Sequence, residues 1–142
     1  MRGKHSEEDA RIQQLARVDR FRGFSDDEIA MVTDAARYIT VPEHWALMVE
    51  QTPADKAYLI LSGEVSVRRQ GEEVARLGAG EVIGEMALVN HKLRSATVVA
   101  ETPLEVLHFT DEIVSDLVAK IPHFREALLG ASEERLQRDS GD

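Results

Sequence analysis

The sequence predicts a mainly β protein, an antiparallel sandwich or barrel with helices on either side of it in the chain. Three observations support this fold class. Residues 38–109 fall into short apolar or alternating runs, which is the pattern of β-strands. These runs stop at turns that contain glycine, at close and regular spacing, as in sandwiches and barrels. Before and after this region, apolar residues recur at helical spacing instead.

Two helices are predicted in a lead-in that covers residues 1–36. The first is expected over Ser6–Arg17, with acidic residues in its first turn, where they favour the helix dipole. The second begins after Ser25, whose hydroxyl is placed to cap it, and Glu28 stands three residues on, as in a capping box. Between the two helices, Phe21 and Phe24 are expected to pack onto the sheet.

The predicted β region covers residues 37–110. The glycines between its strands are expected to supply positive φ in turns, and only Gly84 requires an explanation that involves a ligand. The predicted strands are Tyr38–Val41, Trp45–Val49, Ala57–Leu61, Val65–Arg69, Val74–Leu77, Thr97–Ala100 and Leu104–Phe109.

The C-terminal part returns to a helical pattern over residues 111–138. Asp111 is expected to cap the first of two helices, and Pro122 is expected to end it and to begin the second, because proline is favoured at the first helical position. A frayed tail is expected over residues 139–142. The whole chain, 1–142, is expected to be a single domain, since its length is ordinary for one domain.

Composition excludes several functions. The chain has 26 acidic residues against 17 Lys and Arg, a net charge of −9, which argues against a surface that binds nucleic acid. It has no cysteine, and its five histidines are scattered without the spacing of metal ligands, so no metal site is expected. No membrane segment is expected, because no apolar run approaches the length of a membrane span. The expected location is cytoplasmic.

One stretch, residues 80–97, carries groups that suit a nucleotide. Gly84 is placed to start a short helical turn, whose free N–H groups attract an anion. Arg94 offers a planar fork of donors that suits a phosphate, and the small Ser95 and Ala96 allow a ligand to approach the backbone. Glu85 would repel a phosphate, but it can accept hydrogen bonds from sugar hydroxyls beside one.

This stretch resembles the phosphate-binding cassette of cyclic nucleotide-binding domains. The resemblance rests on two runs, Gly84-Glu85-x-Ala87-Leu88 and Arg94-Ser95-Ala96-Thr97. The family includes regulatory subunits of cyclic AMP-dependent protein kinase, the catabolite activator protein and cyclic nucleotide-gated channels. Membership would imply an eight-stranded antiparallel β-roll, a double-stranded β-helix of the jelly-roll type, with N-terminal helices and two C-terminal helices.

The resemblance also implies roles for residues. Glu85 would hold the ribose 2′-hydroxyl, Arg94 would pair with the cyclic phosphate, and backbone amides would complete the cradle. Two positions depart from the family: Leu93 stands where proline is common, and Ile83 where a large aromatic is common. The candidate ligand-binding residues are Ile83, Gly84, Glu85, Met86, Ala87, Arg94, Ser95 and Ala96.

The implied function is a cyclic nucleotide receptor without catalysis and without a cofactor. The expected ligand is cAMP, with cGMP as the alternative, because Ser95 stands where threonine accompanies a preference for cGMP in the family. The last helix would close over the base and pass its movement to an effector protein or domain. The chain could be free-standing or part of a larger protein.

Two other functions compete with this one. A β-roll could serve as a protein-interaction or dimerisation module that no longer binds nucleotide, and a homodimer would then form through the C-terminal helix. The presence of Glu85 and Arg94 argues against this alternative. An enzyme on a β-barrel is disfavoured, because the sequence offers no histidine cluster and no plausible catalytic triad.

Overall fold

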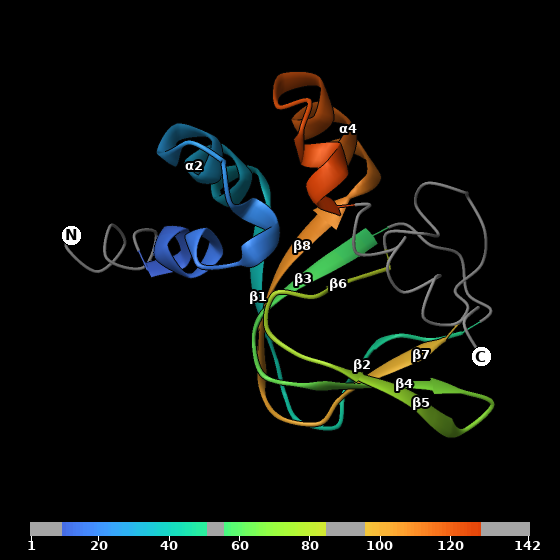
Figure 1. Cartoon of the computed structure of the whole chain (residues 1–142). Helices are drawn as coiled ribbons and strands as arrows, with labels where there is room; N and C mark the ends of the chain where they lie inside the picture. The colour runs from blue at the N-terminus through green and yellow to red at the C-terminus, as the bar shows by residue number, and fades with distance from the viewer. Residues whose placement is uncertain (1–9, 51–55, 85–95, 129–142) are drawn as a thin grey trace.

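The computed structural model describes residues 10–50, 56–84 and 96–128. Within these ranges, eight strands form two four-stranded antiparallel sheets, which confirms the predicted fold class. Figure 1 shows the helices gathered at one end of the molecule, over one sheet, with the other sheet at the opposite end. Sheet A has the order β1 (Arg37–Val41), β8 (Leu104–Thr110), β3 (Lys56–Ser62), β6 (Val82–Ile83), and sheet B has the order β2 (Ala46–Met48), β7 (Thr97–Ala100), β4 (Val65–Arg69), β5 (Glu72–Leu77).

Sheet A is buried on both faces. On β3, Leu59 and Leu61 join an apolar cluster with the helices, whereas Tyr58 and Ile60 join a second cluster between the two sheets. This explains why β3 is a continuous apolar run and does not alternate, since a strand that is covered on both sides has no polar face.

Two of the helices begin at capping residues. Residues 10–16 are helical, a 3-10 turn η1 follows at Asp19–Phe21, and α2 spans Asp26–Ala35. Ser25 and Glu28 form the predicted capping box at the start of α2. The sequence placed the cap of the next helix one residue too late: α4 spans Asp111–Lys120, and the Thr110 hydroxyl accepts the hydrogen bond from the Ile113 N–H at 3.2 Å.

The predicted bend at Pro122 is confirmed, although its position differs slightly. After α4 ends, Pro122 and His123 form a turn, and residues 124–128 are helical again. Pro122 therefore lies in the turn and not at the first helical position. The two phenylalanines of the lead-in face this region: the Phe21 ring lies 6.3 Å from that of Phe124, and the Phe24 ring lies 4.5 Å from that of His123.

Glycine is required where β3 turns into β4. Gly63 has a φ of +98°, and a Cβ atom there would lie 2.5 Å from the Pro103 carbonyl oxygen and 2.6 Å from Cδ2 of Leu104. Both the backbone conformation and the close approach therefore exclude a side chain. This tight crossing holds the β3–β4 turn against the start of β8.

The N-terminal helix is fastened to sheet A through Glu105 on β8. The Glu105 carboxylate accepts hydrogen bonds from the Tyr38 hydroxyl, from the Ser62 hydroxyl at 2.7 Å and from the Gln14 amide at 3.5 Å. Arg11, on the same helix as Gln14, stacks 4.1 Å above the Tyr38 ring. These donors, Tyr38 first, hold the pKa of Glu105 below its usual value.

Glu105 should make stability depend on pH in the acid range. Because its pKa is lower in the folded state, its contribution is fully present above the unfolded pKa of about 4.3 and is lost as pH falls through the folded value. Replacing Glu105 by Gln should therefore flatten the fall in melting temperature between about pH 5 and about pH 3. Melting curves across this range test this, with the exposed acid Glu112, changed to Gln, as the control. Parallel curves for wild type and Glu105→Gln would contradict it.

Candidate functional site

The candidate ligand-binding stretch, residues 80–97, connects the two sheets. It enters through β6, which pairs with β3 in sheet A, and it leaves through Ala96 into β7, which pairs with β2 and β4 in sheet B. The stretch therefore runs from an edge strand of one sheet to an inner strand of the other. β6 was not predicted from the sequence, because a strand of two residues is too short to show an alternating pattern of apolar and polar residues. Only its pairing with β3 defines it.

Three of the candidate ligand-binding residues are described by the structure. Ile83 is 1% exposed and Ala96 is 8% exposed, and the Ile83 side chain packs in the cluster between the sheets with Val98 of β7. Gly84 ends β6 with a φ of +87°, in the region that favours glycine. This conformation favours glycine here, as it does in the turns. The role of Gly84 toward a ligand stays a prediction. The other candidates lie outside the described residues: Glu85, Met86, Ala87, Arg94 and Ser95.

The exit from the stretch is tied to two other loops. The Glu50 N–H donates a hydrogen bond to the Thr97 hydroxyl at 3.0 Å, and the Glu50 carboxylate accepts one from the Gln70 N–H at 2.9 Å. Glu50 thus connects the end of β2, the first residue of β7 and the β4–β5 turn. Sequence reasoning missed it, because nothing in the local pattern around Glu50 marks these partners.

The entrance is tied to the N-terminal segment. Arg20, the middle residue of η1, donates from Nε to the Gly80 carbonyl at 2.8 Å and from Nη1 to the Ala127 carbonyl at 2.9 Å. Its Nη2 lies 3.8 Å from Oε2 of Glu81. Sequence reasoning missed Arg20 as well, since it treated this segment only as a break between helices.

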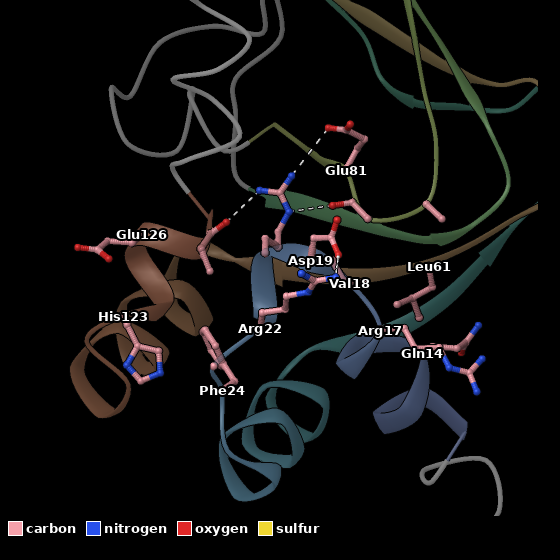
Figure 2. A pocket seen from close by; sticks show the side chains of 15 residues that line it. Gln14, Arg17, Val18, Asp19, Arg22, Phe24, Leu61, Glu81, His123 and Glu126 are labelled. Carbon is pink, nitrogen blue, oxygen red and sulfur yellow. Dashed lines mark hydrogen bonds and ion pairs between the residues drawn. The ribbon is translucent and has the colours of Figure 1, made fainter.

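Arg20 lies in an open groove of about 1150 Å³. Figure 2 shows that the residues lining this groove come from segments that lie far apart in the sequence: the N-terminal segment, β3 at Leu61, the β5–β6 turn and the start of the last helix. Its described lining includes none of the three described candidates, Ile83, Gly84 and Ala96. It borders the turn at residues 79–81, which leads into the predicted site.

A second contact holds the start of the last helix. His123 Nε2 lies 3.2 Å from Oε1 of Glu28, which also closes the capping box of α2. The Ser25 N–H, first, and the neighbouring His123 hold the pKa of Glu28 below its usual value. The turn between α4 and the 124–128 helix therefore rests on the N-terminus of α2.

The described ranges also limit other chemistry. Among residues 10–50, 56–84 and 96–128, no three His, Asp or Glu side chains are arranged to hold a metal ion. Over the same residues, none of the helices has the length and apolar character needed to cross a membrane.

The fold and the arrangement of this stretch match a known class of domain. Residues 38–120, more than half of the chain, match the model of the cyclic nucleotide-binding domain family. The chain therefore belongs to this family, and the eight strands in two sheets with flanking helices are its β-roll.

Similar proteins support the assignment. A CRP-like cAMP-activated global transcriptional regulator of Mycobacterium tuberculosis is 23% identical over 133 residues, which cover 90% of this chain and 59% of the regulator. A cAMP-dependent protein kinase regulatory subunit of Yarrowia lipolytica is 40% identical over 77 residues, which cover 53% of this chain and 20% of the subunit. The chain thus spans less than two thirds of these curated relatives.

A solved structure gives the same fold. The cyclic nucleotide-binding domain from Methylobacillus flagellatus superposes with a TM-score of 0.79 at 28% identity, covering 95% of this chain and 80% of that one. The β-roll that the sequence resemblance implied is therefore confirmed as the fold.

Proposed function

We propose that this chain is a non-catalytic cyclic nucleotide receptor. The observation that carries the proposal is the family match over residues 38–120, with a glutamate and an arginine at the matching positions of the cassette. The stretch that holds these residues starts from β6 and ends at β7, both of which are fixed by strand pairing. A receptor needs such fixed ends, because a pre-organised loop loses less entropy on binding.

Two charged residues of the stretch, Glu85 and Arg94, contact different parts of the ligand. Arg94 binds the cyclic phosphate, because its planar guanidinium offers two parallel donors to two phosphate oxygens. Glu85 accepts hydrogen bonds from the ribose 2′-hydroxyl. Backbone amides of Gly84, Ala87 and Ala96 add further donors, and the small side chains there let the phosphate come close.

We propose cAMP as the preferred ligand. Ser95 stands at the position where threonine accompanies cGMP preference in the family, and its hydroxyl serves the phosphate. The names of two relatives support the choice, since both the Mycobacterium tuberculosis regulator and the Yarrowia lipolytica subunit are named for cAMP. A cGMP-dependent protein kinase of Eimeria tenella, 28% identical over 124 residues, keeps cGMP as the alternative to be measured.

The output of the receptor is a movement of the C-terminal helices. The 124–128 helix follows a turn at Pro122 and His123, where the chain can bend without breaking either helix. Ligand can shift this helix only by binding its two positions with different affinity. The movement passes to an effector, either another protein or a further domain.

A second candidate function has one observation in its favour. The regulatory subunit of a cAMP-independent protein kinase A from Trypanosoma brucei has this fold, with a TM-score of 0.71 at 21% identity. The fold by itself therefore does not imply that a protein responds to cAMP. A module that has kept the β-roll for protein interaction or dimerisation, and has lost the ligand, is the alternative.

A calorimetric titration with cAMP, and in parallel with cGMP, separates the two functions. The protein is first unfolded, freed of any co-purified nucleotide and refolded, and its extract is checked for absorbance by a nucleotide. Saturable binding of either ligand at micromolar concentration or below supports the receptor, and the ratio of the two dissociation constants gives the preferred base. No heat from an empty protein would instead support the interaction module.

A further inference from the structure

Arg20 joins three segments that are distant in sequence. Its side chain is 15% exposed, and it contacts the β5–β6 turn at Gly80 and Glu81 and the last helix at Ala127. In Figure 2, dashed lines mark hydrogen bonds and ion pairs among the residues that line the groove, and one of them ends at Glu81. Because two of the acceptors are backbone carbonyls, the contacts depend on where the two segments lie and not on which side chains they carry.

The turn that Arg20 holds is rigidly connected to the predicted ligand site. The Gly80 N–H donates to the Ile60 carbonyl at 2.8 Å, and the Ile60 N–H donates to the Glu81 carbonyl at 3.0 Å. From there β6 (Val82–Ile83) continues in register with β3, and Gly84 follows it directly. The chain is therefore bound to sheet A from Gly80 to Ile83, the residue before Gly84.

The helix that Arg20 holds is the one whose movement would carry the signal. Ala127 lies in the 124–128 helix, which is anchored by Phe124 and Leu128, 0% and 2% exposed. The Arg20 Nη1–Ala127 contact adds a polar tie on the side of this helix that faces the groove. A shift of the helix would break this tie while the tie to Gly80 stays in place.

Hydrogen bonds from a charged donor are stronger than neutral ones, and a partly buried guanidinium that loses an acceptor must find another.

The neighbouring Arg22 offers a contrast. It pairs with Asp19 at 3.2 Å, but its side chain is 82% exposed, so that pair contributes little. The two arginines therefore differ in burial and in reach: Arg20 is mostly buried and bridges distant segments, whereas Arg22 is exposed and pairs with Asp19 nearby.

We propose that Arg20 is a positioning residue that couples the last helix to the entrance of the ligand site. It would stabilise the helix in its docked position on sheet A without touching the ligand. The proposal rests on the proposed receptor function, because it assigns the docked helix to the state that binds cyclic nucleotide. Affinity falls in proportion when the competent state is less populated.

The test compares Arg20→Gln with Arg22→Gln in the full chain. Both variants lose one positive charge from the same region, but only the first loses a bridge. Arg20→Gln should bind cAMP about five- to twentyfold more weakly than wild type, and Arg22→Gln should stay within about twofold. Arg20→Lys should recover less than half of the loss, because a single ammonium lacks the fork that reaches two carbonyls. Far-UV circular dichroism checks that each variant is folded.

A second readout follows the helix without ligand. Amide hydrogen exchange in residues 124–128 should speed up in Arg20→Gln and not in Arg22→Gln. Equal affinity and equal exchange in the two variants would overturn the proposal, as would full recovery in Arg20→Lys. A wild-type protein that binds neither nucleotide would refute the receptor function and, with it, the predicted effect on affinity. The comparison of hydrogen exchange would still decide whether Arg20 anchors the helix.

Discussion

Replacing Arg94 by Ala should weaken binding of cAMP by about 2–5 kcal/mol, the usual cost of removing one partner of a desolvated charge pair. The reason lies in the ligand: a cyclic phosphate carries a full negative charge that must leave water on binding. Backbone amides near Gly84 and Ala96 can offset part of this cost, but they carry no net charge. The Arg94 guanidinium is the one positively charged group of the motif.

Titration calorimetry measures this effect, with Lys92→Ala as the matched control. Lys92 is a cation two positions away in the same stretch, but it is not part of the motif that resembles the family. Its replacement should change affinity by less than about 1 kcal/mol, because the motif assigns it no contact with the ligand. Unchanged affinity in Arg94→Ala would contradict the site assignment, whatever the overall function.

Replacing Phe124 by Ala should lower the free energy of unfolding by about 3–5 kcal/mol, the range found for a fully buried phenylalanine. Phe124 is 0% exposed and lies among aromatic rings from two other elements. Its ring centroid is 6.3 Å from that of Phe21 and 5.9 Å from that of Phe109 on β8. The truncation leaves a cavity that these rings cannot fill, because each is fixed by its own element.

Denaturant unfolding measures the loss, followed by far-UV circular dichroism and by the fluorescence of Trp45, the single tryptophan. Met31→Ala is the surface control, since this residue of α2 is 37% exposed and should cost less than about 1 kcal/mol. Phe124→Leu should cost less than half as much as Phe124→Ala, because most of the volume is kept. A loss below about 1 kcal/mol in Phe124→Ala would show that the last helix contributes little to folding.

Patterns of neighbouring residues explain which elements could be predicted correctly from the sequence. β4 and β7 have the predicted bounds, Val65–Arg69 and Thr97–Ala100. Turn residues or a change in the apolar pattern mark the end of each strand in the sequence. α2 begins after Ser25, as predicted, because a capping box is a pattern of adjacent residues. Features encoded within a few residues are visible in the sequence.

Features that depend on distant partners were not predicted from the sequence. β6 exists because β3 lies beside it, and its two residues carry no period of their own. Arg20 and its acceptors are separated by 60 and 107 positions, and no local pattern marks such a bridge. The ligand motif could be predicted for the opposite reason, since Gly84, Glu85 and Arg94 stand within one short stretch.

The double-sided burial of sheet A gives the molecule two separate apolar cores. Val82 packs with the helices and Ile83 packs between the sheets, so even the shortest strand divides its side chains between the two. A substitution inside one core therefore changes contacts in that core first, and it reaches the other core only through the backbone of the strands that both cores share.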